Sequence, residues 1–556
     1  MDVDAILRSL GKYGRYQTLQ FAYNMFCMPM ITYSLVIYVF IGHIPDFLCK
    51  VPAENITKYY SQSDRLENAT LSPRQCDVII EINRSGLVTK DNILCSDGYE
   101  YVGPATAASE WNLVCDSEGL GSLSTTITVV GGMVGAILFP SLADKYGRLR
   151  IIYTTFISLS MCFVLASIVP WFNAFVILRF LTGMFGEGSG LALGTLVIES
   201  FPAESRGTVT TIGNIGWALS ISSLALVAFL LRHVSWRYTM LAAGLIGVHS
   251  LGTRWILQES LRWLVANGRH KEIKEWIKRA AKWNKKDASD ILAAMTSANG
   301  EVQVLVENDN DVNGLQSDDK KPGTINKDSH GLEKLSIMDI FRHKHILLTS
   351  ILVWIICHCN TVLYGAKFVN SLTYYGLFLT SGSMSGNMYL NFFLNGMVEI
   401  PSVFLYMNSI NRYGRKKTCI MFHAIAGVSL SISAILIFIG DTPVIKGFAS
   451  AMSFAGKFGI SGSYMAIFLY TPEIYPTNLR ALGLGLGSTM ARVGGMISPY
   501  AALFGSHISW GPGVVFGSLS VLVTILFLWL PETNGRELPA TLDDLKQFYI
   551  IKANKK

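Results

Sequence analysis

The chain has 556 residues, half of them hydrophobic and only 15% charged, and its formal net charge is +7. A soluble protein of this length would carry more charge, so the composition indicates an integral membrane protein. The lysines and arginines lie in short connections between apolar runs, as the positive-inside rule requires, so the net charge gives no reason to expect nucleic-acid binding.

The first 18 residues carry Arg8, Lys12 and Arg15 without a small-residue cleavage site. We therefore expect a cytosolic N-terminus over residues 1–18 and not a removable signal peptide. A membrane-spanning helix needs about 20 apolar residues. Windows of that length predict spans at 19–41, 121–141, 151–170, 173–198, 208–231 and 236–257. These spans form an N-terminal bundle over residues 19–261.

A polar loop at 44–119 follows the first span and is predicted to be extracellular. It combines Asn-x-Ser/Thr acceptors with cysteines, which is typical of an oxidising compartment. The acceptors are Asn55, Asn68 and Asn83, and the cysteines are Cys49, Cys76, Cys95 and Cys115. Two disulfides are expected, and three connectivities are open.

A polar insert at 262–343 separates the two halves and is predicted to be cytosolic. Its first part places Lys271, Lys274, Trp276 and Lys278 at helical spacing, which favours helices lying along the inner membrane face. Its middle, 298–332, is expected to be disordered. Further spans are predicted at 346–378, 387–407, 418–440, 445–470, 484–505 and 511–530. They form a C-terminal bundle over 344–532, followed by a cytosolic tail at 533–556.

Three motifs recur in the same order about 270 residues apart, so the two halves are copies of one unit. Leu142-Ala-Asp-Lys-Tyr-Gly-Arg-Leu-Arg150 matches Ile410-Asn-Arg-Tyr-Gly-Arg-Lys-Lys417. Glu199-Ser-Phe-Pro-Ala-Glu-Ser-Arg206 matches Glu473-Ile-Tyr-Pro-Thr-Asn-Leu-Arg480, and Trp255-Ile-Leu-Gln-Glu-Ser260 matches Trp529-Leu-Pro-Glu-Thr533. The predicted fold is an all-α membrane protein of twelve transmembrane helices in two pseudo-symmetric six-helix bundles, with both termini in the cytosol.

Several ionisable side chains fall inside predicted spans, where each costs about 2.5 to 3.5 kcal/mol and needs a partner, water or a task. They are Arg179, Glu187, Glu399, Lys457 and Arg492. Lys457 is about 18 Å from either end of its helix, too far to snorkel. For Lys457 and Arg492 we weigh contact with a substrate against a structural ion pair. Glu187 is equally compatible with pairing to Arg179, and Glu399 with a structural role beside Pro401.

The aromatic side chains of Tyr374, Tyr375 and Trp217 are candidates to hold a cationic ligand, although such residues also serve packing. The chain has no Gly-x4-Gly-Lys-Ser/Thr loop for ATP and no catalytic nucleophile or zinc motif. We therefore expect no enzyme, no metal site and no resident cofactor. A Na⁺ or H⁺ gradient is left open as the driving force.

These motifs resemble the major facilitator superfamily and, within it, solute carrier family 22, the transporters of organic cations, zwitterions and anions. Arg179-Phe-Leu-Thr-Gly183, Pro531-Glu-Thr-Asn-Gly535 and Glu110-Trp-Asn-Leu-Val-Cys115 add to the resemblance. It implies a plasma-membrane protein, monomeric as a transport unit, whose two bundles rock around a central pocket to give alternating access.

By that resemblance, Glu399, Tyr374, Lys457 and Arg492 match pocket positions. A cytoplasmic charge network that closes the inner side is matched by Asp144, Arg148, Glu199, Arg206, Arg415, Glu473 and Arg480. An arginine at 492 is typical of members that carry carnitine or anions. We therefore expect a transporter of small charged organic solutes, with a cation or carnitine-like zwitterion favoured and an organic anion as the alternative.

Two departures from the family pattern bear on function. Gln258-Glu-Ser-Leu-Arg-Trp263 lacks both usual prolines, which puts the inner latch in doubt. In the seventh span, Lys367 stands before Phe368 where the family has a tryptophan, and the nearest upstream tryptophan is Trp354. About a dozen extra residues make this span overlong, so it must tilt, break or push residues 355–367 out of line. A second alternative is therefore a transport-impaired, receptor-like or scaffold protein.

Overall fold

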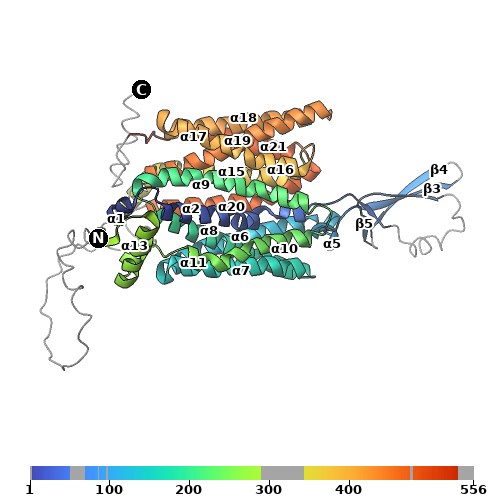
Figure 1. Ribbon diagram of the computed structural model, residues 1–556. Coiled ribbons are helices and arrows are strands. Elements are labelled where there is room, and N and C mark those ends of the chain that lie inside the picture. The colour runs from blue at the N-terminus through green and yellow to red at the C-terminus, as the bar shows by residue number, and fades with distance from the viewer. Residues whose placement is uncertain are drawn as a thin grey trace.

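The computed structural model describes residues 3–50, 69–84, 87–95, 98–289, 344–475 and 480–535. Through these residues run twelve membrane-crossing segments, with strands at one end and short helices at the other (Figure 1). The N-terminal half contributes α2 (Arg15–Val36) with α3 (Tyr38–Ile41), α6 (Glu118–Tyr146), α7 (Arg148–Ile168), α8 (Phe172–Glu199), α9 (Arg206–Leu230), and α10 (Trp236–Ile246) with α11 (Thr253–Ile256).

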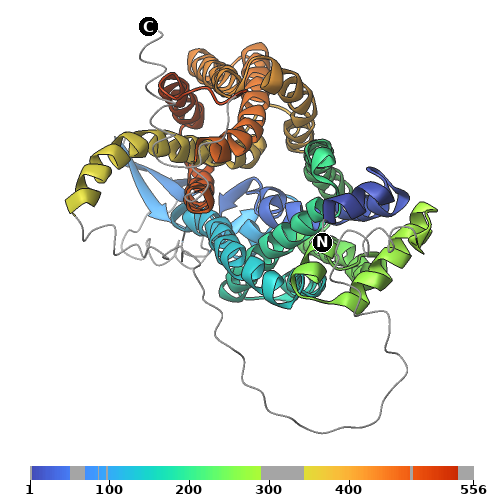
Figure 2. The same cartoon turned by 90° about the vertical axis from the view of Figure 1, so that its left-hand side faces the viewer.

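The C-terminal half contributes the other six segments and stands beside the first half (Figure 2). They are α15 (Lys344–Leu379), α16 (Met388–Met397) with α17 (Glu399–Arg412), α18 (Arg415–Ile439), α19 (Pro443–Ile474), α20 (Arg480–His507) and α21 (Gly511–Phe527). Among the described helices, six segments are long and apolar enough to cross a bilayer by themselves: α6, α7, α8, α9, α16 with α17, and α18. The predicted fold of two six-helix bundles is confirmed.

The overlong seventh span is one unbroken helix of 36 residues, α15. At about 1.5 Å per residue it is about 54 Å long, against a hydrocarbon core of about 30 Å. Of the three outcomes predicted from the extra residues, a break is therefore excluded.

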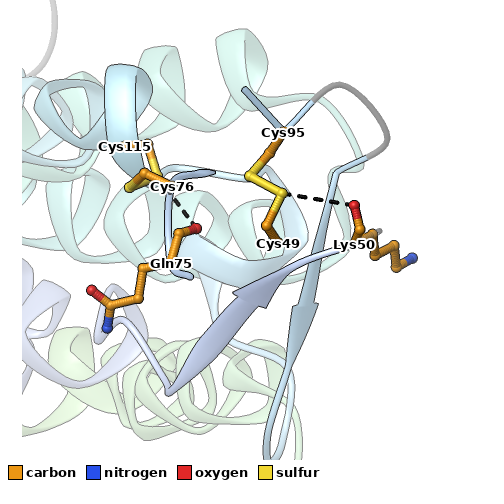
Figure 3. Close-up of a disulfide and its surroundings, with 6 residues drawn as sticks. All are labelled: Cys49, Lys50, Gln75, Cys76, Cys95 and Cys115. Atoms are coloured by element: carbon orange, nitrogen blue, oxygen red, sulfur yellow. Dashed lines mark hydrogen bonds between the residues drawn. A yellow bond between two sulfur atoms is a disulfide. The ribbon is translucent and has the colours of Figure 1, made fainter. Parts of the chain in front are cut away.

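The loop after the first span contains two small antiparallel sheets, which the sequence analysis did not predict. β1 (Phe47–Cys49) pairs with β5 (Tyr99–Tyr101), and β3 (Asp77–Arg84) lies between β2 (Ala69–Pro73) and β4 (Leu87–Leu94). Disulfides join Cys49 to Cys95 and Cys76 to Cys115, which selects one of the three connectivities (Figure 3). Asn83 lies on β3, whereas Asn55 and Asn68 lie outside the described residues.

The basic helix of the insert, α13 (His270–Asn284), packs its apolar face against other helices of the protein. Ile273, Trp276 and Ile277 are buried in a cluster with the apolar faces of α1 (Val3–Leu10) and α12 (Leu261–Ala266). Two partners from other parts of the chain therefore cover this face, and the predicted position of the helix along the inner membrane face stays a prediction. The insert's middle, 298–332, lies outside the described residues.

We call the end that carries the strands the sheet face, and the end that carries the two Tyr-Gly-Arg turns the turn face. Toward the sheet face, α6 and α20 join the two halves: Thr126 Oγ1 donates to the Met496 carbonyl at 2.8 Å, and Ser122 Oγ to the Pro499 carbonyl at 3.3 Å. There the Phe40 ring also stacks on Tyr389 of α16, with centroids 5.4 Å apart. The two halves are therefore closed against each other at the sheet face.

Candidate functional site

A cavity of about 350 Å³ lies between the two halves at mid-membrane level. Helices α2, α8 and α9 line it from one half, and α15, α17 and α19 from the other. Five residues singled out from the sequence line it: Glu187, Trp217, Tyr374, Tyr375 and Glu399. The structure thus brings together side chains that are up to about 200 residues apart in the chain.

Lys457 lies behind the cavity wall as the ion-pair partner of Glu399. Its ammonium is 3.0 Å from Glu399 Oε1, and the side chain is fully buried. The same ammonium lies 3.1 Å from the centroid of the Tyr374 ring and 3.9 Å from that of Phe378. The aromatic face of Tyr374, predicted to hold a cationic ligand, is therefore occupied by a cation of the protein itself.

Arg492 of α20 pairs with Glu187 of α8, at 2.9 Å, and so joins the two halves. The predicted alternative, Glu187 with Arg179, is wrong. Arg179 is two helical turns away, about 12 Å along α8, and instead donates to the Ser34 carbonyl of α2 at 3.2 Å.

A second contact at this level also crosses between the halves. Trp217 Nε1 of α9 donates to the Tyr374 hydroxyl of α15 at 2.9 Å. Since Tyr374 in turn contacts Lys457, the halves are linked through one continuous polar group. Anything that displaces one member of this group disturbs the contact between the bundles.

Sequence analysis missed four polar residues of the lining, Asn24, Asn214, Ser461 and Tyr464. A signal was present for Asn24, because it follows Gln17 and Gln20 on one face of the first span. The side chains of Gln17, Gln20 and Asn24 are buried. A row of amides inside a membrane helix must face protein or a cavity, because lipid offers no hydrogen bonds.

On the turn face, the N-terminal half holds a charge cluster around Arg148. Its guanidinium is 3.0 Å from Asp144 and 3.1 Å from Glu199. The backbone amides of Arg148 and Leu149, at the start of α7, both donate to Glu259, at 2.9 and 3.1 Å. Glu259 accepts these bonds although the two prolines usual around it are missing, so their absence does not remove this contact.

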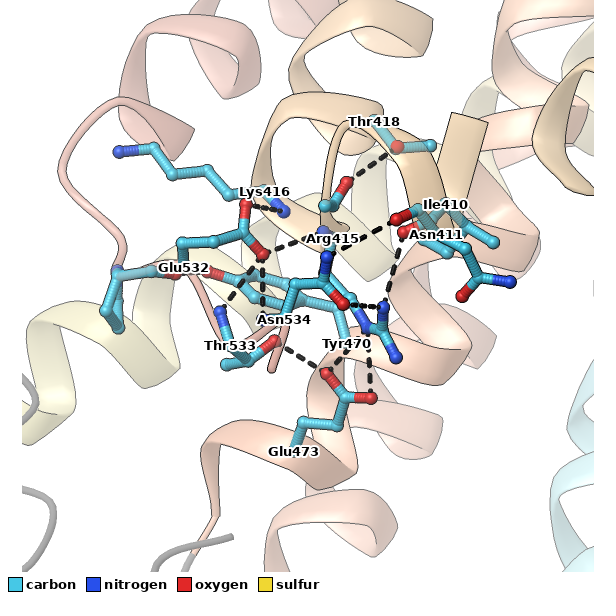
Figure 4. Close-up of polar contacts among 12 residues, drawn as sticks. Ile410, Asn411, Arg415, Lys416, Thr418, Tyr470, Glu473, Glu532, Thr533 and Asn534 are labelled. Atoms are coloured by element: carbon cyan, nitrogen blue, oxygen red, sulfur yellow. Dashed lines mark hydrogen bonds and ion pairs between the residues drawn. The ribbon is translucent and has the colours of Figure 1, made fainter. Parts of the chain in front are cut away.

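The C-terminal half repeats this cluster (Figure 4). Arg415 is 3.2 Å from Glu473, and Glu532 accepts from the backbone amides of Arg415 and Lys416 at 2.8 and 3.2 Å. The glycines before α7 and α18 both have positive φ, +100° at Gly147 and +91° at Gly414, and a Cβ at either would meet the capping glutamate. The sequence repeat is therefore a repeat of geometry at these positions: Arg148 and Arg415 each pair with a glutamate, and Glu259 and Glu532 each accept from a helix start.

The remaining predicted gate residues differ in their placement. Arg206 pairs with Asp4 of α1 at 3.3 Å, and Arg262 pairs with the same carboxylate at 2.7 Å. Hydrogen bonding from Arg262 holds the pKa of the Asp4 carboxyl below its usual value. The side chain of Arg480 lies outside the described residues. The ion pairs of Arg148, Arg206 and Arg415 described here stay within one half.

The comparisons with known proteins agree with this architecture. The sequence profile of the Major Facilitator Superfamily matches residues 102–499. The chain belongs to this superfamily. Its curated relatives include solute carrier family 22 member 16 of Xenopus laevis, 29% identical over 96% of this chain and 92% of the relative. The organic cation transporter protein of Drosophila melanogaster is 28% identical over 99% of this chain and 95% of its own.

Another member of the same carrier family, member 7 of Rattus norvegicus, is 28% identical over 98% of both chains. The resemblance to solute carrier family 22 is thereby confirmed, and the protein is a membrane transporter of the superfamily. Among solved structures, the xylose transporter XylE from E. coli in an inward open conformation matches 95% of this chain and 99% of its own, with a TM-score of 0.57 at 12% identity. That likeness concerns the fold.

Proposed function

We propose that this transporter moves small organic solutes that carry an ammonium group, either cations or zwitterions such as carnitine, by alternating access. The supporting observation is the cavity lining, where the carboxylates of Glu187 and Glu399 lie beside Trp217 and Tyr375. Carboxylates and aromatic faces are the groups that bind an ammonium in a dry site.

The charges of the cavity balance, because each lining carboxylate already holds one cation of the protein. Glu399 holds Lys457, and Glu187 holds Arg492. An incoming ammonium competes for these carboxylates, and competition at Glu187 releases Arg492 to bind a carboxylate of the solute. A zwitterion can therefore replace an internal ion pair without leaving an unpaired charge.

This exchange also supports a coupling between binding and movement. The Arg492–Glu187 pair crosses between the halves, so a solute that breaks it loosens one contact that holds them together. The state described here is closed at the sheet face, and we assign it as the one whose cavity opens toward the turn face. The opposite state requires the α6–α20 contacts to part.

The orientation and location follow from the same proposal. The basic turns, α1 and α13 lie on the turn face, and positive charge concentrates on the cytosolic side of membrane proteins. The sheet face carries disulfides, which form in oxidising compartments. We place the turn face in the cytosol and the sheet face outside the cell, at the plasma membrane, with an ion gradient or the membrane potential driving transport.

Uptake into proteoliposomes tests this proposal. Purified protein should accumulate labelled carnitine or tetraethylammonium, and Glu187→Gln and Glu399→Gln should each reduce uptake at least about tenfold. Glu272→Gln, an exposed carboxylate on α13 paired with Arg269, is the matched control and should transport normally. If the protein carried only aromatic anions such as p-aminohippurate, or if the two glutamine variants behaved like the control, the proposal would be wrong.

The second candidate, a transport-impaired receptor-like protein, is favoured by one observation, the 36-residue length of α15. Deleting residues 355–366 distinguishes the two. A receptor-like protein would show uptake only after the deletion, whereas the transporter shows it in the full chain.

A further inference from the structure

A second buried lysine, Lys367, lies in the C-terminal half outside the site described above. It is 4% exposed. It precedes Tyr374 by seven residues, so it lies on nearly the same face of α15, about 10 Å closer to the turn face. A solute that moves between the cavity and the turn face therefore passes at its level.

Aromatic rings connect Lys367 to the cavity. Its ammonium lies 5.3 Å from the centroid of the Phe468 ring on α19. Phe468 in turn contacts Tyr464, a residue of the cavity lining, with ring centroids 5.3 Å apart. The Phe468 side chain is 54% exposed, whereas Lys367 beside it is buried.

The space for the lysine is made by Gly487 on α20. A Cβ at that position would lie 2.9 Å from both Nζ and Cδ of Lys367, closer than side chains pack. The lysine is thus held between α15 and α20, with its ammonium toward the Phe468 ring.

Lys367 lacks the carboxylate partner that Lys457 and Arg492 have. The buried Arg179 also lacks one, but its guanidinium donates to the Ser34 carbonyl at 3.2 Å. Lys457 and Arg492 each have a carboxylate within 3.0 Å. Within the described part of the chain, no carboxylate forms an ion pair with Lys367. A buried ammonium without an anion is costly, and an anion from outside the protein would offset that cost.

We propose that Lys367 is an anion subsite that binds the carboxylate of the solute on the turn-face side of the cavity. This inference rests on the proposed function, because it supplies the second end of the same solute. In the cavity the ammonium lies between Glu187 and Glu399 and the carboxylate pairs with Arg492. As the solute moves toward the turn face, the carboxylate passes to Lys367. The substrate class is then narrowed from ammonium compounds to elongated solutes that carry an ammonium at one end and a carboxylate at the other.

Three variants test the subsite in proteoliposomes. Lys367→Met removes the charge, Lys367→Arg keeps it, and Lys446→Met removes a lysine that pairs with Asp441 near the sheet face. Lys367→Met should raise KM for carnitine by about tenfold or more and leave KM for tetraethylammonium within about twofold. Lys367→Arg should retain most carnitine affinity, and Lys446→Met should match wild type. A Lys367→Met variant that changes both probes equally, or neither, overturns the proposal.

An inorganic anion is the other source of the same chemistry, and replacing chloride by gluconate distinguishes it. A solute carboxylate at Lys367 predicts carnitine uptake that does not depend on chloride. Chloride-dependent uptake of tetraethylammonium that is lost in Lys367→Met overturns the assignment to the solute.

A binding assay separates failure of the subsite from failure of the proposed function. If wild-type protein carried none of the probes, the transport proposal would fail, while thermal unfolding in detergent would still report on Lys367. A carboxylate probe, p-aminohippurate, should then raise the unfolding temperature of wild type and Lys446→Met but not of Lys367→Met. An equal rise in all three proteins, or no rise in wild type, overturns the subsite.

Discussion

Replacing Glu399 by glutamine tests whether the buried pair with Lys457 is held by charge. Lys457 is fully buried and its ammonium is 3.0 Å from the carboxylate. Removing one partner of such a pair leaves an uncompensated charge and typically costs about 3–5 kcal/mol, whereas removing both partners is often nearly neutral. The Tyr374 ring offsets part of this cost, about 2 kcal/mol for a desolvated contact. We expect Glu399→Gln and Lys457→Met each to destabilise strongly, and the double variant to recover most of the loss.

Thermal unfolding of the four proteins in detergent measures this cycle. Glu272→Gln is the control for loss of a carboxylate, because its partner Arg269 is half exposed and surface pairs contribute at most about 1 kcal/mol. A double variant as unstable as the two single losses added together would refute the reasoning.

Three further predictions follow from particular contacts. Gly183→Val should destabilise the protein by about 1–3 kcal/mol and lower its unfolding temperature, because the added Cβ would overlap the facing backbone of α6. Gly194→Ala is the control and should leave the unfolding temperature unchanged, because the space around Gly194 is open. Trp217→Phe and Tyr374→Phe each remove the hydrogen bond between these side chains and should each lower the free energy of unfolding by about 0.5–1.5 kcal/mol. The double variant should lose no more than one single variant does. Additive losses would show that this hydrogen bond contributes nothing. The pKa of the Asp4 carboxyl, which attaches α1, is lowered below 3.8, so the attachment should be intact at neutral pH and be lost as the pH falls below about 4. Proteolysis of the N-terminus should therefore increase below about pH 4, and in Asp4→Asn it should be increased at every pH.

The architecture was predictable from the sequence because membrane spans are specified by composition and length. Each predicted window corresponds to one of the described segments, from α2 to α21. The internal repeat carried further information, since Glu259 and Glu532 proved to cap equivalent helix starts. Repeated motifs at matching offsets therefore mark equivalent contacts at the ends of helices in the two halves.

The pairing of the buried charges was less predictable, because it depends on which helix faces which. Spacing along α8 made Arg179 a reasonable partner for Glu187, but Arg492 from the other half took that place. Likewise, Tyr374 lines the cavity, while the cation over its ring comes from the protein itself. Distances within one helix follow from the sequence, whereas contacts across the interface need the packed bundle.

The small sheets and the packing partners of α13 were missed for a similar reason. Short strands in the loop after the first span are fixed by two disulfides, whose connectivity a sequence leaves open. The apolar face of α13 was assigned to lipid because its partners, α1 and α12, lie elsewhere in the chain. An amphipathic helix indicates that a surface is covered, but not what covers it.

The central claim, that a charged solute drives the two halves between states, is tested most directly by two spin-label distances in lipid nanodiscs. One pair, at Tyr146 and Tyr413, reports on the turn face, and the other, at Leu120 and Phe504, on the sheet face; all four side chains are exposed. We predict that a solute that is transported shortens the first distance and lengthens the second in the same fraction of molecules. Distances that stay unchanged during measurable transport, or that move in the same direction, would contradict the account.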